Sequence, residues 1–224
     1  MKERPILFSG QMVRAILEGR KTQTRRIVTT AKDKDTGCEL AQHEIAAEAN
    51  AGNYRNCRYG QPGDRLWVRE TWGVISHGWN EHDQMVDWIP DRPATPIHEM
   101  RFGRGYYSGH VIYAADGSNE WPSDDDGGGE PRSCWRPSIH MPRQASRITL
   151  EITSVHAERL NDISEADAKA EGAPLELGKL EAEILGTKAK YRSGFCRLWE
   201  SINGSGSWDA NPIVLAIEFK VVQL

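Results

Sequence analysis

The sequence predicts one α+β domain spanning residues 1–224, made of short strands and short helices and carrying two long insertions. Apolar and polar residues alternate over 146–157 and 213–222, which indicates strands, whereas apolar residues spaced three or four apart over 11–18 indicate a helix. The chain is 38% hydrophobic and 27% charged, which suits one well-buried domain. Polar stretches at about 29–59 and 73–130 interrupt these patterns and predict the insertions.

The N-terminal segment predicts a strand followed by a helix. Arg4–Ser9 has strand character, and Ser9 is suited to cap the next helix. Gln11–Glu18 places four apolar residues at helical spacing, and Gly19 follows where a left-handed residue ends a helix. The chain after Gly19 therefore leaves a helix C-terminus in an extended conformation.

The segment from Gly19 to Arg26 is the strongest candidate for a functional site. It contains four cations and two threonines and no carboxylate. Positive charge is favourable at a helix C-terminus, so one interpretation is a solvated basic turn. Lys21 and Thr24 favour a functional interpretation, because an amine and a hydroxyl three residues apart converge if the chain is still turning there.

A second candidate surface follows the Pro62–Gly63 turn. The predicted strand after it places Leu66 and Val68 on a buried face and Arg65, Trp67 and Arg69 on the other. Two cations and an indole on one face are suited to stacking a base and neutralising phosphate. The alternative is that Trp67 closes the edge of the core. In the rest of 73–136, little more than one strand is expected, at His110–Ala115.

The C-terminal half supplies further candidates. Two prolines between Cys134 and Arg143 fix an irregular path that carries Trp135 and His140. His140 is either a ligand contact or proton relay, or a buried histidine bonded to a backbone carbonyl. Ser164 is a predicted N-cap, with Asp167 completing a capping box.

Gly172 ends that helix and leaves Glu171 at its C-terminus, where the helix dipole opposes a carboxylate. Pairing of Glu171 with Lys21 would explain this position. Two helices are then expected over Leu177–Ile202, before a last strand at Ile213–Val222.

Charge and composition restrict the kinds of partner. The net charge of −4 argues against a general nucleic-acid coat, but residues 11–30 and 131–150 each carry about +4. A small anionic ligand or a short piece of single-stranded or structured RNA fits this pattern. No apolar run of 18 residues and no signal-peptide pattern occurs, so a cytoplasmic protein without a membrane partner is expected. The scattered cysteines predict no metal site, and no cofactor is expected.

The pattern Gly19-x-Lys21-x-x-Thr24-x-Arg26 resembles the signature of ASCH domains, PUA-like β-barrels associated with RNA and modified nucleosides. Threonine at the sixth position is similar to the bacterial N(4)-acetylcytidine amidohydrolases of that superfamily. Residues 60–72, 135–147 and 217–220 also resemble ASCH proteins, the second of them those of phages and prophages. The resemblance implies a mixed β-barrel of about five to seven strands flanked by short helices, with Lys21, Thr24 and Glu171 as catalytic residues.

The leading hypothesis is therefore an amidohydrolase that acts on an acylated nucleoside. Thr24 would be the nucleophile, Lys21 its base, and Glu171 the group that positions Lys21 or protonates the departing amine. Neighbouring arginines and burial are expected to lower the pKa of Lys21. Arg26 would stabilise an oxyanion or a phosphate. The predicted ligand- or nucleic-acid-binding residues are Arg20, Arg25, Arg26, Arg65, Trp67, Arg69, Trp135 and His140.

Two alternatives use the same residues. A non-catalytic reader of RNA or of a modified base would use the cationic groove and Trp67. A ribonuclease would use His140 as its acid or base. The sequence predicts no particular oligomeric state.

Overall fold

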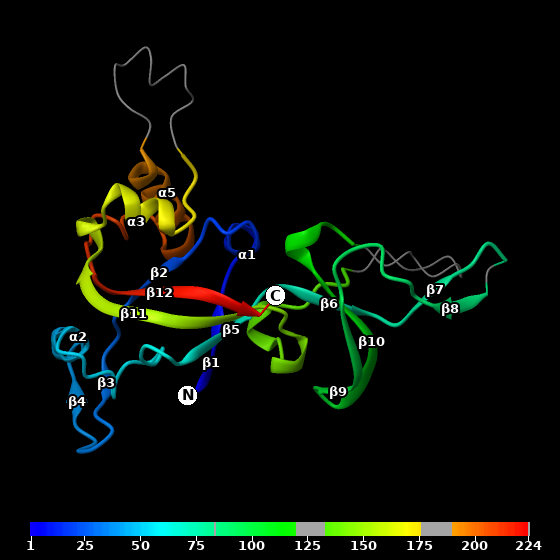
Figure 1. Ribbon diagram of the computed structural model, residues 1–224, viewed down its shortest axis with the longest axis horizontal. Helices are drawn as coiled ribbons and strands as arrows, with labels where there is room; N and C mark the ends of the chain where they lie inside the picture. The colour runs from blue at the N-terminus through cyan, green and yellow to red at the C-terminus, as the bar shows by residue number, and fades with distance from the viewer. Residues whose placement is uncertain (83, 120–132, 176–189, 224) are drawn as a thin grey trace, which may run out of the picture. The chain divides into compact units, whose positions relative to one another are not determined.

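The computed structural model describes residues 1–82, 84–119, 133–175 and 190–223 and has an α+β fold (Figure 1). The chain divides into two compact units. The first unit contains Met1–Arg4, Ala15–Leu66 and Leu150–Val222, and the second contains Pro5–Arg14 and Trp67–Thr149.

The main sheet has five strands in the order β1-β5-β11-β12-β2. Their bounds are β1 (Glu3–Leu7), β2 (Gln23–Ile27), β5 (Arg65–Arg69), β11 (Thr149–Arg159) and β12 (Ile213–Gln223). Within the described residues the outer strands β1 and β2 do not pair with each other, so the sheet is open there. The strands predicted from alternation near residues 4, 65, 146 and 213 are confirmed within a few residues.

Three helices of the first unit lie on and beside this sheet. These are α2 (Gln42–Asn50), α3 (Glu165–Ala170) and α5 (Tyr191–Asn203). The predicted capping box is confirmed, because Ser164 Oγ accepts from Asp167 N at 3.1 Å and the Asp167 carboxylate accepts from Ser164 N at 3.4 Å. The first predicted insertion contains α2 and a small hairpin, β3 (Ala31–Lys32) with β4 (Glu39–Leu40).

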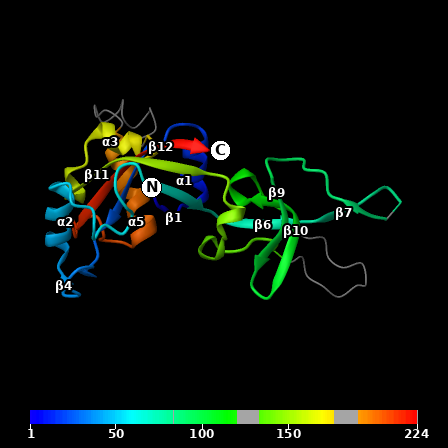
Figure 2. The same cartoon turned by 60° about the horizontal axis from the view of Figure 1, so that its bottom comes forward.

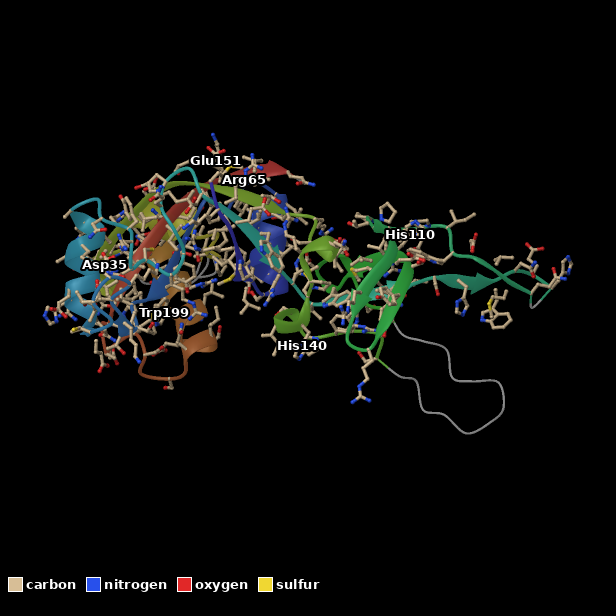
Figure 3. All side chains as sticks on the ribbon, turned by 90° about the horizontal axis from the view of Figure 1, so that it is seen from below. Asp35, Arg65, His110, His140, Glu151 and Trp199 are labelled. Atoms are coloured by element: carbon tan, nitrogen blue, oxygen red, sulfur yellow. The ribbon has the colours of Figure 1, made fainter. Side chains whose placement is uncertain are left out.

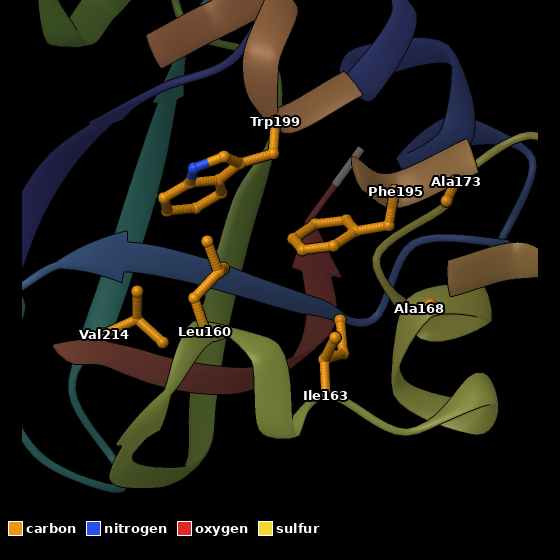
Figure 4. Packing of buried hydrophobic residues seen from close by; sticks show 7 residues of the cluster. All are labelled: Leu160, Ile163, Ala168, Ala173, Phe195, Trp199 and Val214. Atoms are coloured by element: carbon orange, nitrogen blue, oxygen red, sulfur yellow. The ribbon is translucent and has the colours of Figure 1, made fainter. Parts of the chain in front are cut away.

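The core of the first unit lies where α3 and α5 pack on the sheet. Figure 4 shows the aromatic rings of Phe195 and Trp199 from α5 facing Leu160, Ile163 and Val214. All five side chains are at most 4% exposed. Of the two helices expected over 177–202, α5 accounts for the second, and residues 176–189 lie outside the described residues.

The second unit has a three-stranded antiparallel sheet of order β6-β10-β9. Its strands are β6 (Trp72–Ile75), β9 (Thr95–Phe102) and β10 (Gly105–Tyr113), and β9 and β10 lie side by side in both Figure 1 and Figure 2. A separate ribbon pairs β7 (His77–Trp79) with β8 (Met85–Asp87). The expectation of little more than one strand in 73–136 was therefore wrong. Pro96 lies in β9, an edge strand, where a missing backbone N–H is tolerated.

One further helix and several short turns connect the strands. Helix α1 (Gly10–Leu17) follows Ser9, whose Oγ accepts from Met12 N at 3.4 Å, as expected of an N-cap. Four 3₁₀ turns are present in the described residues: Ala114–Asp116, Ser138–His140, Arg143–Ala145 and Leu160–Asp162. In the same residues no helix is long and apolar enough to span a membrane. The acidic glycine run at 124–129 lies outside the described residues.

Candidate functional site

The turn between α1 and β2 brings Lys21 against the end of α3. Gly19 has φ of 70°, which confirms the left-handed helix end, and Lys21 N then donates to Ala15 O at 2.9 Å. Lys21 and Glu171 form an isolated antiparallel bridge. Gly172 has φ of 75°, and a Cβ there would lie 2.8 Å from Ala15 Cβ, so glycine permits this close approach.

The Lys21–Glu171 pair predicted from the sequence is present. Lys21 Nζ lies 2.7 Å from Glu171 Oε2, and it also donates to Glu171 O at 2.9 Å and Gln23 O at 2.7 Å. Three acceptors match the three protons of an ammonium group, so the resting amine is fully hydrogen-bonded. Burial lowers the pKa of Lys21, Glu171 opposes that change, and Arg26 and Arg25 reinforce it.

Arg25 shares the Glu171 carboxylate with Lys21. Its Nη1 lies 3.3 Å from Glu171 Oε1 and 2.8 Å from Gln23 Oε1, and its Nε donates to Glu158 Oε1 at 2.7 Å. The Arg25 side chain is completely buried, and its Nη2 has no hydrogen-bond partner in the described part of the chain. We call Lys21, Arg25, Glu158 and Glu171 the β2 cluster. It combines two buried cations with two carboxylates.

Thr24 lies in β2 opposite Ile217 and has no exposed surface. Its Oγ1 has no hydrogen-bond partner among the described residues, so no hydrogen bond joins it to the Lys21 amine. Gln23 already starts the strand, and alternation turns the Thr24 side chain away from the face of Gln23 and Arg25. The Lys21 amine instead binds the Gln23 carbonyl, in the peptide that immediately precedes Thr24.

The three predicted catalytic residues are all covered by the chain. Lys21, Thr24 and Glu171 are 1%, 0% and 2% exposed. A buried hydroxyl without a partner is rare because it costs about 1–3 kcal/mol of desolvation. The Thr24 hydroxyl, like Arg25 Nη2, is therefore a buried polar group of this site that the described contacts do not explain.

The other predicted cations of the first unit differ in environment. Arg20 is exposed and pairs with Glu18. Arg26 is partly buried, and burial lowers its pKa, while Tyr59 and Glu171 act in the opposite direction. Arg65 is also partly buried, and its Nε has no hydrogen-bond partner in the described residues.

The remaining predicted ligand-binding residues belong to the second unit. Trp67 is 8% exposed, so the prediction of a single buried face for this strand was wrong. The Arg69 guanidinium lies 4.7 Å from the Trp67 ring centre and donates to Ile139 O, which is the core-edge arrangement given as the alternative. Trp135 packs against a buried cluster, whereas His140 is exposed (Figure 3) and is not the buried histidine of the alternative.

Sequence reasoning missed the partners of Arg25. Glu158 lies in the alternating strand β11, where a charged residue is expected and gives no sign of an ion pair. Asp167 lies 3.7 Å from Arg25 Nη2, although its capping role already accounts for its presence in the sequence. No group of three or more metal-ligating side chains occurs in the described residues.

Comparison with known proteins gives no match to a protein-family model, a curated protein or a solved structure. Proposals about function therefore depend on the geometry of the chain and on the resemblance of its motif.

Proposed function

We propose that the protein is an ASCH-type, PUA-like amidohydrolase that acts on an acylated nucleoside such as N(4)-acetylcytidine. The contact of 2.7 Å between Lys21 Nζ and Glu171 Oε2 carries this proposal, because 150 positions separate the two residues. A buried threonine hydroxyl without a partner lies in the adjoining strand. The motif assigns these three residue types to one hydrolytic site.

The chemistry begins with a proton shift inside the ion pair. Transfer from the Lys21 ammonium to the Glu171 carboxylate gives a neutral amine beside a carboxylic acid. The amine then takes the Thr24 proton as the hydroxyl oxygen bonds to the acyl carbon. The C–N bond breaks, the departing amine takes the proton held by Glu171, and water later hydrolyses the acyl-threonine. The lowered pKa of Lys21 favours its service as the base.

This reaction requires access to a covered site. The Thr24 hydroxyl has no exposed surface, so a substrate carbonyl reaches it only when the packing over β2 opens. Arg26, partly buried in the same strand, would then stabilise the oxyanion. The proposal also requires that this opening bring Thr24 within reach of the Lys21 amine, because no hydrogen bond joins the two groups in this structure.

The test is release of cytidine from N(4)-acetylcytidine by the wild type, Thr24→Val and Lys21→Met. Both variants are expected to lose at least about 10²-fold in turnover, because a positioned general base usually contributes at least that factor. Lys220→Met is the matched control, because Lys220 is an exposed lysine paired with Glu151. Wild-type turnover is expected to fall as the pH rises through the lowered pKa of Lys21, because the departing amine then lacks the proton that the Lys21–Glu171 pair shares. Full activity in either site variant would discard the assigned roles.

A second candidate function is binding of RNA or of a modified base without hydrolysis. The three acceptors around the Lys21 amine favour it, because a fully bonded ammonium also acts as a structural lock between β2 and α3. This function predicts RNA binding that weakens with salt and yields no product. The same incubation with acetylated cytidine separates it from the hydrolase.

A further inference from the structure

A cavity of ≈ 370 Å³ lies in the first unit where β2 ends and the 29–59 segment begins. Its apolar wall consists of Ile27 at the end of β2, Val28 directly after it, Leu215 from β12 and Ile45 from α2. Val28, Leu215 and Ile45 are at most 4% exposed, so this wall belongs to the buried core. The volume is at the lower end of the range for small-ligand sites, about 300–1,000 Å³. It suits a ligand with one ring system.

The rest of the lining is cationic and contains no carboxylate. Lys32, Lys34 and Arg58 line the cavity, and all three are exposed. Lys34 Nζ donates to Arg55 O, whereas Lys32 and Arg58 form no ion pair with a described residue. Unpaired cations over an apolar wall favour a ligand that is both flat and anionic.

Tyr59 and Asn56 are two further residues of the lining. Tyr59 is partly exposed, so its ring is accessible to a planar ligand. Asn56 is 6% exposed and its amide donates to Asp33 Oδ2 at 3.0 Å and Glu48 Oε2 at 2.9 Å. Its Oδ1 accepts from Lys34 N at 3.2 Å. Asn56 therefore fixes the cationic segment in place and is a positioning residue.

We propose that this cavity binds a nucleoside monophosphate, with the base against the apolar wall and Tyr59 and the phosphate on Lys32 and Arg58. An anionic ring ligand follows from the lining alone, and its assignment as a nucleotide rests on the proposed function. The opposite end of β2 holds the β2 cluster, and Arg26, next to Ile27 of the cavity, interacts electrostatically with both Tyr59 and Glu171. Because Lys32 and Arg58 would bind the phosphate, the cavity selects phosphorylated over free nucleosides.

The experiment is calorimetric titration of the full chain with cytidine monophosphate, cytidine, inorganic phosphate and a cytidine oligonucleotide. The monophosphate is expected to bind at least about tenfold more tightly than cytidine or phosphate, and more weakly as salt is added. An oligonucleotide that binds no more tightly than the monophosphate supports a one-nucleotide site. Equal binding of cytidine and its monophosphate, or a clear preference for the oligonucleotide, overturns the proposal.

Two arginines three residues apart provide matched variants. Arg58 lines the cavity, whereas Arg55 is exposed, pairs with Asp35 and lines a separate polar hollow. Arg58→Ala is expected to weaken monophosphate binding roughly tenfold, and Arg55→Ala to leave it unchanged. Equal losses in both would indicate a diffuse cationic surface and overturn the proposal.

Thr30→Trp fills the cavity from an exposed position, and loss of binding is expected provided that the thermal unfolding midpoint is retained. Retained binding in a folded Thr30→Trp protein would show that the ligand lies elsewhere. Thr24→Val is expected to bind the monophosphate normally even if it hydrolyses nothing. Loss of hydrolysis with normal binding would concern only the hydrolase proposal, whereas absence of monophosphate binding would concern only the cavity.

Discussion

Each unit buries an ion cluster, and the two clusters satisfy their polar groups differently. In the second unit, Arg147 lies between two carboxylates and an aromatic ring, a set we call the Arg147 cluster. Its Nε and Nη2 bind the Glu70 oxygens at 3.0 and 3.1 Å, and Nη1 binds Asp116 Oδ2 at 2.6 Å. The guanidinium lies 3.9 Å from the centre of the Tyr113 ring.

The Arg147 cluster has the geometry of a structural lock. Each of two edges of the guanidinium plane is hydrogen-bonded to a carboxylate, and its face packs on a ring. All three guanidinium nitrogens therefore have a partner. Tyr113 is itself anchored, because its hydroxyl donates to Ala145 O at 3.0 Å. Burial raises the pKa of Tyr113 well above its ordinary value, so the phenol stays neutral.

The β2 cluster is incompletely satisfied by comparison. Arg25 Nη2 and the hydroxyl of the adjoining Thr24 lack hydrogen-bond partners among the described residues, although both are buried. Arg25 pairs with Glu158, Asp167 and Glu171, but its Nη2 lies 3.7 Å from Asp167 Oδ2, beyond hydrogen-bond distance. Nε, Nη1 and Nη2 of Arg147 are all hydrogen-bonded to a carboxylate. The difference indicates that the Arg147 cluster contributes to stability and that the β2 cluster retains polar groups for another purpose.

The largest expected effect comes from removing one cation from each cluster. Arg147→Met removes the salt-bridge partner of the buried Glu70 carboxylate and one partner of Asp116, and it is expected to cost about 3–5 kcal/mol of unfolding free energy. Lys21→Met is expected to cost less, because Glu171 keeps its contact with Arg25. Urea unfolding of both variants measures the order, and a larger loss for Lys21→Met would contradict the comparison.

The pH dependence sharpens the same prediction. Burial already raises the pKa of Glu70, with Arg147 acting in the opposite direction, so removal of Arg147 raises it further. A carboxyl with a raised folded-state pKa binds more protons folded than unfolded, so its stability contribution falls as pH rises through that pKa. The deficit of Arg147→Met is therefore expected to shrink in acid, where Glu70 is protonated. A deficit that is constant with pH would show that Glu70 is not the unpaired group.

Smaller effects are expected at two buried threonines, where the same substitution should change stability in opposite directions. Thr24 is 0% and Thr149 is 1% exposed, but Thr149 Oγ1 accepts from Arg143 Nη2 at 3.1 Å. Thr149→Val is expected to cost about 1 kcal/mol, whereas Thr24→Val is expected to stabilise the fold by about 1 kcal/mol, since it removes an unpaired hydroxyl. Urea unfolding measures both changes, and thermal unfolding provides an independent check. Destabilisation by Thr24→Val equal to that of Thr149→Val would mean that its hydroxyl has a partner.

The sequence predicted the parts of this fold that depend on local rules. The helix end at Gly19 and the capping box at Ser164 need only nearby residues, and both are present. The Lys21–Glu171 pair was also predictable, because a carboxylate at a helix C-terminus is unfavourable without a cation. In the second unit, the strand predicted at His110–Ala115 corresponds to the end of β10, whereas β6 and β9 were missed. Both pair with β10, and their own sequences lack the continuous alternation that would have identified them.

The partners of the site could not be predicted for a similar reason. Arg25 binds Glu158 from a strand 133 positions away, and nothing local distinguishes that glutamate from any other on a strand surface. The separation of Thr24 from the Lys21 amine depends on where β2 begins, which a stretch of alternating cations and threonines does not define. Side-chain direction in a strand changes completely with a shift of one residue.

The smallest expected effect is at Arg20, which tests whether charge alone defines the β2 cluster. Arg20 adjoins Lys21 in sequence, but its side chain is 52% exposed and pairs with Glu18, which is 53% exposed. Exposed ion pairs contribute little because water screens them, so Arg20→Gln is expected to change unfolding free energy by at most about 0.5 kcal/mol. Arg25→Gln, in the completely buried member of the same basic run, is the paired measurement and is expected to cost several times more. Equal losses for the two arginines in urea unfolding would mean that the cluster is held by the net charge of the segment and not by its buried contacts.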